Sequence, residues 1–432
     1  MNSTCIDLFA GCGGLSLGLG KAGFRTKFAI EQHADAFQTY RTNLLDRKGS
    51  THDWPEWLPK MAWSGEAVLR EFGENLKALR GRVDLIAGGP PCQGFSLNGL
   101  RNQTDPRNNM IGVYLNYVEI IRPRLVLLEN VVGITSMMHE GEETYSEHIK
   151  TRLTELGYDC WDSVLQAADW GVPQFRRRFV IIAALKGFLP GINPMERLRV
   201  SRRAFLTERS LEPSITGTGA ALSDLESGDE DLRPDPEWGN RGFKALTRSS
   251  PSQSPYQKLM RKGTRTQPTD MRLPRHSAVV TSRMQNILKT CARGVSLRPA
   301  DRGRLGIAKR STTPLDPDQP SPTISTMPDD FIHYLEPRTM TVREHARLQS
   351  FPDWFSFKGP YTTGGERRKN ACPRYTQVGN AVPPLLAEAL GETLLGLLRV
   401  NQITYPANGG DVGGELPSDI REVRDRDLLT TF

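Results

Sequence analysis

The sequence predicts an α/β protein built on a doubly wound, mostly parallel sheet, with a second, loop-rich domain following it. Over residues 1–187, short apolar runs alternate with helical patterns, which is typical of strand–helix–strand units. From residue 188 to 335 this alternation gives way to Pro, Ser, Thr, Gly and Arg. The 432 residues allow two or three domains, so both parts have room for a core.

The elements follow in a regular order. Strands are expected at residues 5–10, 28–31, 83–87, 125–129 and 179–183, with a helix after the first of them that ends near Lys21. Helical patterns resume at 340–349 and at 383–398, where two prolines stand at the tolerated start of the helix. We therefore expect residues 336–400 to return to the first domain. Residues 401–432 are expected to form a mobile tail.

Composition excludes several classes of protein. No uninterrupted apolar run has the roughly 18 residues of a membrane span, and the N-terminus lacks the pattern of a secretory signal. The six cysteines are scattered, with none of the Cys/His spacings of a zinc site. We expect a cytoplasmic protein in a reducing compartment, with no membrane partner and no metal.

The positive charge is concentrated in one segment. Residues 241–310 hold 17 Lys or Arg and two acids, a net of 17 − 2 = +15, whereas the whole chain carries +7. The remainder therefore carries 7 − 15 = −8. This distribution is typical of a protein that binds a polyanion, although a solvated basic surface would have the same composition.

A glycine-rich turn follows the first expected strand. Gly11, Gly13 and Gly14 allow a tight turn and close approach of the backbone to a ligand at the start of the next helix. Glu31 ends the second strand 20 positions after Gly11, where an acid binds ribose hydroxyls in nucleotide folds. Ser16 replaces the third glycine of the dinucleotide fingerprint. The pattern favours an adenosine-type cofactor, and an ordinary glycine turn is the alternative.

Reactive side chains stand at the ends of two further strands and at the start of a third. Cys92 stands in a stiff Pro/Gly loop after residues 83–87, and Glu129 ends the strand at 125–129. Alternation along the next strand places Gln174, Arg176 and Arg178 on one face. Because ligands bind at the carboxyl ends of parallel strands, a thiol, a carboxyl group and two arginines are expected at one rim.

These segments together resemble the cytosine-C5 DNA methyltransferase family, from residue 5 to about residue 400, with the basic middle segment excepted. The matching blocks, in chain order, are residues 7–14, Glu31, residues 89–96, residues 129–131, Gln174-x-Arg176-x-Arg178, residues 341–352 and residues 377–384. Single blocks are weak signals, whereas all of them in order are specific. The resemblance implies the S-adenosylmethionine-dependent methyltransferase fold, with residues 188–335 as a target-recognition domain.

The resemblance also implies roles for individual residues. Cys92 would be the nucleophile and Glu129 the proton donor to the base, while Arg176 and Arg178 would steady the thiolate and the base carbonyl. The S-adenosyl-L-methionine pocket would be lined by Phe9, Gly11, Gly13, Gly14, Glu31, Glu66, Pro90 and Asn380. Two positions depart from the family pattern, because Gln32 replaces an aromatic residue after the ribose-binding acid and Glu66 replaces an Asp.

The chemistry requires these residue types. A thiolate that adds to carbon 6 of cytosine turns carbon 5 into a nucleophile. Cysteine suits this role because its thiolate is accessible and is a strong nucleophile. Glu129 would have to be protonated in a dry pocket to donate to ring nitrogen 3. Since carbon 5 is inaccessible in a stacked duplex, the nucleotide must flip out, and Asn98 could fill the space.

The expected partners follow from this reaction. Double-stranded DNA would be the substrate of a monomeric enzyme of the minimal bacterial or phage type, with a restriction endonuclease of the same site as a further partner. An RNA methyltransferase of the same fold is the first alternative, but no Cys-Phe-Thr motif stands near Cys291. A non-catalytic DNA-binding relative and a nicotinamide oxidoreductase are weaker alternatives, because neither accounts for Cys92 and Glu129.

Overall fold

The computed structural model describes most of the chain. The described residues are 3–91, 110–139, 141, 143–226, 231–237, 239–247, 250–264, 267–362 and 371–404, with side chains to residue 399. Cys92 and Asn98 lie outside them, so the predicted nucleophile has no described position. Most of the predicted tail lies outside them as well.

A six-stranded sheet forms the centre of the molecule. Its strand order is β2-β1-β3-β4-β9-β7. The bounds are β1 (Thr4–Leu8), β2 (Arg25–Ile30), β3 (Leu85–Gly88), β4 (Leu125–Val131), β7 (Tyr158–Gln166) and β9 (Arg177–Leu185). Neighbouring strands from β2 to β4 are parallel, and β9 runs antiparallel to β4 and β7. The sheet is therefore mostly parallel, as predicted, with one reversed strand.

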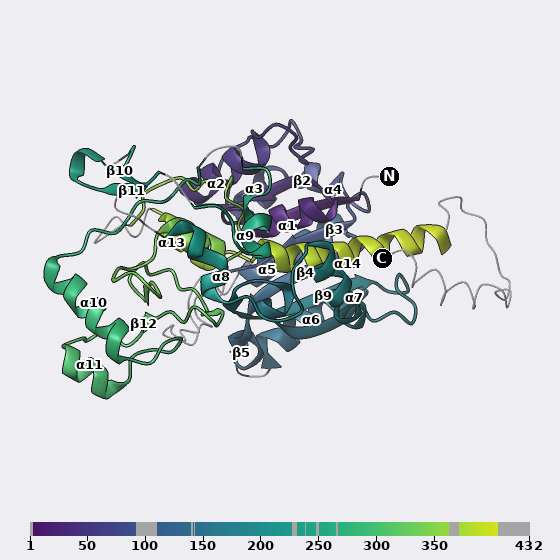
Figure 1. The fold of residues 1–432 in the computed structure, drawn as a ribbon. Coiled ribbons are helices and arrows are strands. Elements are labelled where there is room, and N and C mark those ends of the chain that lie inside the picture. The colour runs from purple at the N-terminus through teal and green to yellow at the C-terminus, as the bar shows by residue number, and fades with distance from the viewer. Residues whose placement is uncertain are drawn as a thin grey trace, which may run out of the picture.

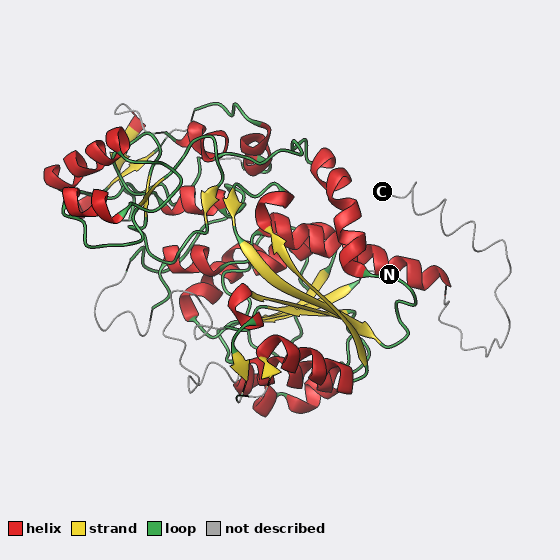
Figure 2. Cartoon of the chain, turned by 90° about the horizontal axis from the view of Figure 1, so that it is seen from below, coloured by secondary structure: helices red, strands yellow, loops and turns green. Residues whose placement is uncertain are grey.

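Helices cover both faces of this sheet, as Figure 2 shows. Alternate strand residues separate into two clusters: Cys5, Leu85 and Leu127 face one layer, whereas Ile6, Ile86 and Leu128 face the other. The first layer contains α1 (Gly14–Ala22), α7 (Pro194–Glu208) and α14 (Pro384–Thr404). The second contains α3 (Gly65–Glu71), α4 (Gly73–Lys77), α5 (Met110–Ile121) and α6 (Tyr145–Glu155). This arrangement is the predicted doubly wound architecture.

The C-terminal elements complete the sheet domain. In α12 (Val342–Leu348) the start is fixed by a capping box, in which Thr341 accepts from the Glu344 amide and Glu344 accepts from the Thr341 amide. Next comes α13 (Arg374–Asn380), and then α14 packs along α1. Helix α14 continues to Thr404, four residues into the segment predicted as a tail, and the mobility of that tail stays a prediction.

One stretch has the apolar character of a membrane helix. Within residues Arg374–Arg399, one stretch of 18 residues reaches a mean hydropathy of 1.4, but 89% of that stretch is buried inside the protein. Leu385, Leu390 and Leu394 on α14 belong to the cluster beneath the sheet. The stretch comprises α13 and α14, and the apolar side chains of α14 form part of the protein core.

The region from 188 to 335 is divided between two environments. At its start, α7 packs on the sheet domain, because Phe205 meets Trp170 at 5.7 Å and Arg209 pairs with Glu388 of α14 at 2.8 Å. Its dense charge hides its apolar stripe in the sequence, which is why the predicted boundary falls before it. Further along, α8 (Thr218–Leu222) and α9 (Pro255–Arg261) contribute to the same core.

A separate small cluster forms farther out. It centres on Ile287, Leu297, Leu305 and Ile332. In Figure 1, α10 (Ala278–Thr290) and α11 (Pro299–Leu305) lie at the left of the molecule, away from the central strands. The assignment of residues 188–335 to a target-recognition domain stays a prediction.

The remaining elements are short. They are α2 (Ala34–Tyr40), η1 (Arg41–Leu45), η3 (Val132–Thr135), β5 (Met138–His139), β6 (Glu143–Thr144), η4 (Ala167–Trp170), β8 (Gln174–Phe175), η5 (Ser223–Leu225), β10 (Leu232–Pro234), η7 (Gly239–Arg241), β11 (Lys244–Leu246), β12 (Thr313–Pro314), β13 (Ser321–Pro322) and β14 (Phe331–Ile332).

Buried ion pairs join the basic segment to the C-terminal elements. Asp270 accepts from Arg374 at 2.9 Å and lies 3.5 Å from Arg343. Asp224 pairs with Arg347 at 3.0 Å and with Arg261 at 2.8 Å. The charges on α12 therefore neutralise acids of the preceding region inside the protein, where a charge without a partner would be costly.

Candidate active site

The glycine loop leaves β1 and opens α1 at one rim of the sheet. Gly11 and Gly13 adopt φ values of +57° and +98°, which side chains disfavour. A methyl group on Gly13 would lie 2.6 Å from Leu44, and one on Gly14 would lie 2.3 Å from the Val382 carbonyl oxygen. A methyl group on Gly11 would meet nothing within 4 Å among the described residues. The loop is thus packed on one side and open beside Gly11, where a ligand can approach the backbone.

Glu31 lies against this loop, as predicted. Its Oε2 accepts from the Gly11 amide at 2.9 Å and its Oε1 accepts from the His33 amide at 2.7 Å. The carboxyl group is buried, and this burial raises its pKa. Each oxygen retains a second lone pair, so the two amides orient the carboxyl group while leaving it able to accept further hydrogen bonds.

Phe9 and Glu66 lie on neighbouring elements. Phe9 adopts φ +60°, a strained value for an aromatic residue, and its ring lies beside Gly65. The amide of Trp63 donates to the Glu31 carbonyl at 2.8 Å, which draws the segment before α3 toward the loop. Glu66 stands in the first turn of α3 and is half-buried. Gln32, in contrast, is exposed.

A buried polar chain beneath the loop has no counterpart in the sequence predictions. The Ser16 hydroxyl donates to Asp7 at 2.6 Å and lies 2.9 Å from the Tyr40 hydroxyl, which meets His52 at 2.6 Å. Asp7 is fully buried and its Oδ1 has no partner among the described residues. Burial raises the pKa of Asp7 to about 7. Asp7 lies in the block of residues 7–14 that resembles the family, but its residue type alone does not predict its hydrogen bonds.

The second group of predicted residues meets where β4 ends. Arg178 Nε lies 2.8 Å from Glu129 Oε1, and both side chains are about nine-tenths buried. Pairing of Val131 with Arg178 across β4 and β9 places the two charges diagonally on one face. A methyl group on Gly89 would lie 3.1 Å from Glu129 Oε2, so the start of the Pro/Gly loop lies against this carboxyl group.

Pro90 continues the same contact. Its carbonyl oxygen accepts from Asn130 Nδ2 at 3.2 Å, so the loop that leads to Cys92 is anchored to the end of β4. The structure therefore brings together Glu129, Arg178 and Pro90 at one rim. The position of Cys92 itself stays a prediction.

Arg176 links the arginine strand to the C-terminal elements. The side chain is buried, with Nη2 donating to the Gly379 carbonyl at 2.9 Å and Nη1 to the Ile324 carbonyl at 3.4 Å. Its burial and then the charge of Arg178 lower its pKa. Asn380 is exposed next to Gly379. The predicted alternation is confirmed, since Gln174, Arg176 and Arg178 are buried whereas Phe175 and Arg177 are exposed.

Two glutamines that the sequence predictions left without a role tie these parts together. Gln349 Nε2 donates to the Val378 carbonyl at 2.8 Å, and Gln349 Oε1 accepts from Gln174 at 2.9 Å. Gln377 Oε1 accepts from the Thr39 hydroxyl at 2.7 Å, and the main-chain carbonyl oxygen of Gln377 accepts from the Cys12 thiol at 3.6 Å. Hydrogen bonds thus connect the segment that holds Gln174 and Arg176, by way of α12 and α13, to the glycine loop.

Burial makes Cys5, Cys12, Cys160 and Cys372 poor nucleophiles. Burial raises the pKa of Cys5 to about 12, of Cys160 to about 11 and of Cys372 to about 12. The pKa of Cys12 is also raised by burial. The histidines His276 and His333 are structural, since both accept backbone amides. Cys291, the fifth described cysteine, packs against the outer cluster of Ile287 and Leu297, and Cys92 stays the predicted nucleophile.

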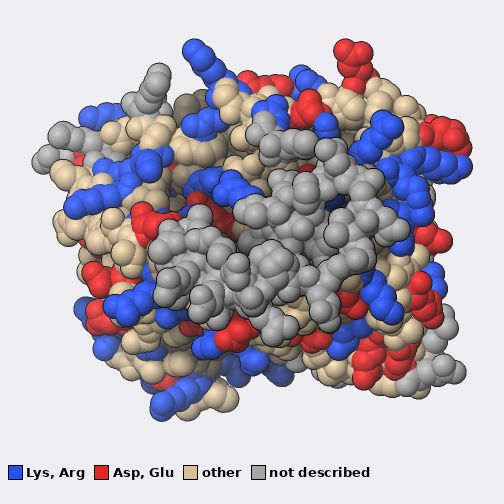
Figure 3. All heavy atoms as spheres, turned by 90° about the vertical axis from the view of Figure 1, so that its right-hand side faces the viewer, with Lys and Arg blue, Asp and Glu red and all other residues tan. Residues whose placement is uncertain are grey.

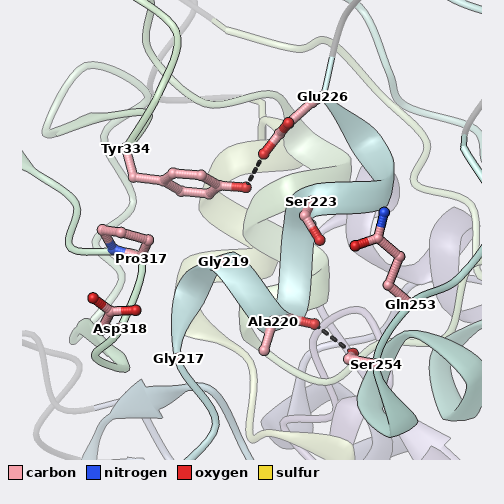
Figure 4. A pocket seen from close by; sticks show the side chains of 10 residues that line it. All are labelled: Gly217, Gly219, Ala220, Ser223, Glu226, Gln253, Ser254, Pro317, Asp318 and Tyr334. Carbon is pink, nitrogen blue, oxygen red and sulfur yellow. Dashed lines mark hydrogen bonds between the residues drawn. The ribbon is translucent and has the colours of Figure 1, made fainter.

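The pocket in Figure 4 lies elsewhere. It has a volume of about 500 Å³ and is lined by residues of α8, the start of α9, residues 317–318 and Tyr334. Tyr334 donates to Glu226 across it, and Ser254 donates to the Ala220 carbonyl at 2.6 Å. None of the predicted site residues that the structure describes lines this pocket, so it is separate from the rim that carries Glu129 and Arg178.

Surface charge is mixed on the face shown in Figure 3, where Lys/Arg and Asp/Glu side chains alternate around the grey atoms. In the basic segment, Arg272 stacks 3.6 Å from the Tyr361 ring, and Lys309 pairs with Asp330 at 2.7 Å. Arg272 and Lys309 therefore stabilise the fold through contacts within the protein. The basic residues of the segment that are exposed are Arg241, Lys244, Lys258, Lys262, Arg275, Lys289, Arg298, Arg304 and Arg310.

Comparison with known proteins gives one consistent result. The sequence model of the C-5 cytosine-specific DNA methylase family matches residues 3–396. The type II methyltransferase M.DdeI of Desulfomicrobium norvegicum is 33% identical over 90% of this chain and 88% of its own length. The type II methyltransferase M1.HphI of Haemophilus parahaemolyticus is 31% identical over 91% of this chain and 87% of its own length.

Solved structures agree. A protein described as a DNA modification methyltransferase encoded within a prophage (E. coli) superposes with a TM-score of 0.61, at 26% identity over 92% of this chain and 99% of that chain. The S. pombe Dnmt2 methyltransferase shares the fold, with a TM-score of 0.52 at 15% identity over 92% of this chain and 99% of that one. The chain belongs to the C-5 cytosine-specific DNA methylase family.

Proposed function

We propose that this protein transfers a methyl group from S-adenosyl-L-methionine to carbon 5 of a flipped cytosine in a short DNA sequence. The observation that carries the proposal is the buried Glu129–Arg178 pair, 2.8 Å apart, at the strand end against which Gly89 lies. A carboxyl group and a guanidinium there match the two polar edges of a cytosine ring, nitrogen 3 and the carbonyl oxygen.

The residues near the glycine loop fit the cofactor. The open side of Gly11 and the two amide-oriented oxygens of Glu31 provide a place for a ribose and its hydroxyls. Phe9, Glu66 and Asn380 would line the same pocket, with Gly13 and Gly14 supporting the loop. When bound, S-adenosyl-L-methionine supplies an electrophilic methyl group.

The chain's own residues would act in sequence. The Cys92 thiolate adds to carbon 6, and the electron pair of the ring double bond becomes available at carbon 5. Arg178 would exchange its Glu129 partner for the base carbonyl, and Glu129 would hold a proton on nitrogen 3. After carbon 5 is methylated, a base accepts its proton, the C–H electron pair restores the ring double bond, and the carbon 6–sulfur bond breaks to release the Cys92 thiolate.

Arg176 would act as a positioning cation. It already ties the strand of Arg178 to the segment that carries Asn380, so it couples the base site to the cofactor site. Its positive charge near the rim would also favour the Cys92 thiolate.

Double-stranded DNA would bind through the exposed basic residues of segment 241–310, which provide phosphate contacts, while other side chains of this region read the bases. Since several relatives are type II methyltransferases, a restriction endonuclease acting on the same sequence is the expected functional partner. The enzyme is proposed to act as a monomer.

The test is transfer of labelled methyl from S-adenosylmethionine to mixed-sequence DNA, with matched RNA in parallel and base-resolved mapping of 5-methylcytosine. We expect label in DNA at one recurring short sequence and none with Cys92→Ser. Label in RNA alone would contradict the proposed substrate. No transfer despite DNA binding would contradict the enzymatic activity.

A further inference from the structure

Three metal-ligating side chains meet beyond the end of β4. His139 ends β5, Glu143 begins β6, and His148 lies in the first turns of α6. Their ligand atoms all lie within 4.8 Å of one another. No metal was predicted from the sequence, because the cysteines are scattered and show none of the Cys/His spacings of a zinc site. His139, Glu143 and His148 stand four and five positions apart along the chain. The β5–β6 hairpin folds them together.

The geometry of the three groups is compact. His148 Nδ1 lies 3.0 Å from Glu143 Oε1, and the imidazoles of His139 and His148 stack with centroids 3.9 Å apart. The side chains of His148 and Glu143 are 25% and 34% exposed. The cluster is thus open enough for an ion to enter and shielded enough to hold it.

Neighbouring structure fixes the cluster from behind. Thr144 and Glu147 form a capping box that sets the start of α6 and therefore the position of His148. The Tyr145 ring, which is buried in the sheet-face cluster, meets His139 edge to face at 4.9 Å. Within the described part of the chain, the His139 imidazole makes these ring contacts and no hydrogen bond. A hydrogen-bonded surface cluster would explain Glu143 and His148 but leaves His139 without a role.

We propose that His139, Glu143 and His148 bind one Zn²⁺ ion. Two imidazole nitrogens and one carboxylate oxygen are the donors that zinc and neighbouring transition ions prefer over Mg²⁺ and Ca²⁺. In a tetrahedral site, ligand atoms lie about 3.3 Å apart, so the Glu143–His148 pair already has the required spacing. The His139 ring must turn out of its stack and approach the other two ligands. Solvent would take the fourth position.

The position of the site indicates what the ion would do. The hairpin follows η3, which continues directly from the strand that carries Glu129. An ion there would cross-link the hairpin to α6 and stabilise the connection behind the catalytic rim. It would take no part in methyl transfer.

The experiment uses the full chain after treatment with a chelator and dialysis. Zn²⁺ is titrated calorimetrically, and Co²⁺ is used as a spectroscopic probe, because a tetrahedral Co²⁺ site absorbs strongly in the visible range. We expect one site per chain and a rise in melting temperature with Zn²⁺. In His139→Gln, His148→Gln and Glu143→Gln the affinity should fall by about tenfold or more. His33→Gln, which changes an exposed histidine outside the cluster, should bind like wild type.

The proposal would be overturned by wild-type binding no tighter than that of His148→Gln, or by a Co²⁺ spectrum that the three substitutions leave unchanged. Melting curves in chelator show whether each variant is folded, and substitutions at half-exposed side chains should leave them unaltered. Because the readout is metal binding, its failure would leave the proposed methyl transfer untouched, and a failure of methyl transfer would leave the metal site untouched.

Discussion

Glu129 is the residue whose chemistry the structure defines best. The Arg178 guanidinium lies 2.8 Å from its carboxyl group, which is buried at the rim where the Pro/Gly loop begins. Donation of a proton to the base therefore requires this pair to open. Arg178 is the residue that can make this exchange, because its other described contact is only to the Arg177 carbonyl.

The first prediction concerns Glu129→Gln. The amide keeps the size and a hydrogen bond to Arg178, but it cannot transfer a proton, so kcat should fall by about 10²- to 10⁴-fold. Binding of DNA and S-adenosylmethionine should stay near the wild-type values. The measurement is single-turnover methyl transfer, with both affinities determined on the same preparation. A rate within about threefold of wild type would remove Glu129 from the chemistry.

A second residue, Asp7, predicts a dependence of stability on pH. Burial raises its pKa to about 7, whereas the pKa of an Asp in an unfolded chain is about 3.9. Between these values the folded protein holds a proton that the unfolded chain has lost, so the Asp7 contribution to the free energy of unfolding falls as pH rises. In Asp7→Asn this loss is absent.

Urea unfolding of both proteins from about pH 5 to about pH 8 measures this contribution. The variant should gain stability relative to wild type as pH rises toward 7, by up to a few kcal/mol, and the difference should level off above it. Stability curves that stay parallel over this range would contradict a buried, protonated Asp7.

At the scale of elements, the close packing of α1 on α14 determines where the glycine loop lies. A methyl group on Gly18 would lie 2.4 Å from the Ala387 Cβ and 2.5 Å from the Pro384 carbonyl oxygen. Gly18→Ala should therefore force the helices apart and lower the free energy of unfolding by about 1–3 kcal/mol.

The matched control for this change is Gly303→Ala in α11, where an added methyl group meets nothing within 4 Å among the described residues. Better helix propensity should leave that variant as stable as wild type or more stable by up to about 1 kcal/mol. Thermal unfolding of the two variants tests the difference. Equal stability of both would mean that α1 and α14 do not pack so closely.

The elements also show how far the sequence determines the structure. Apolar runs predicted β1, β2, β3, β4 and β9, because strands buried on both faces have continuous apolar sequences. The long strand β7 was missed, since its residues Asp159, Asp162 and Ser163 interrupt the pattern. The reversed direction of β9 depends on strand pairing across the sheet, which no local pattern encodes.

The candidate site was predicted in parts. Residue type and position at strand ends predicted Glu31 and Glu129, because parallel strands bring their carboxyl ends to one rim. Arg178 reaches the same rim from the start of β9, because β9 runs antiparallel to β4. The Asp7–Ser16–Tyr40 chain and the His139–Glu143–His148 cluster could not be predicted, because each depends on side chains that meet only after folding. Arg176 was expected at the thiolate, and its bonds to main-chain carbonyls appear only in three dimensions.

At the scale of the whole molecule, buried charges hold the basic segment to the sheet domain. Asp270 adopts φ +66° and binds Arg343 and Arg374, whose side chains are 0% and 7% exposed. Asp270→Asn retains the backbone conformation, since Asn tolerates positive φ, but it removes the carboxylate next to the buried Arg343 and one of the two next to Arg374, which also pairs with Glu237 at 2.7 Å. The free energy of unfolding should fall by about 3–5 kcal/mol.

The control is Asp301→Asn, whose partner Arg304 is 46% exposed. Loss of this surface pair should change stability by no more than about 1 kcal/mol. Chemical unfolding of both variants gives the comparison. If Asp270→Asn were as mild as the control, buried ion pairs would not join the two regions.

The most direct test of the proposed mechanism is a covalent trap on the target base. In 5-fluorocytosine the fluorine replaces the proton that must leave carbon 5, so an adduct at carbon 6 cannot be resolved after methylation. Substrate DNA with this base should form a complex that survives denaturation, requires S-adenosylmethionine and yields a peptide cross-linked at Cys92. Methyl transfer to ordinary DNA without such a complex, or a cross-link at another residue, would contradict nucleophilic catalysis by Cys92.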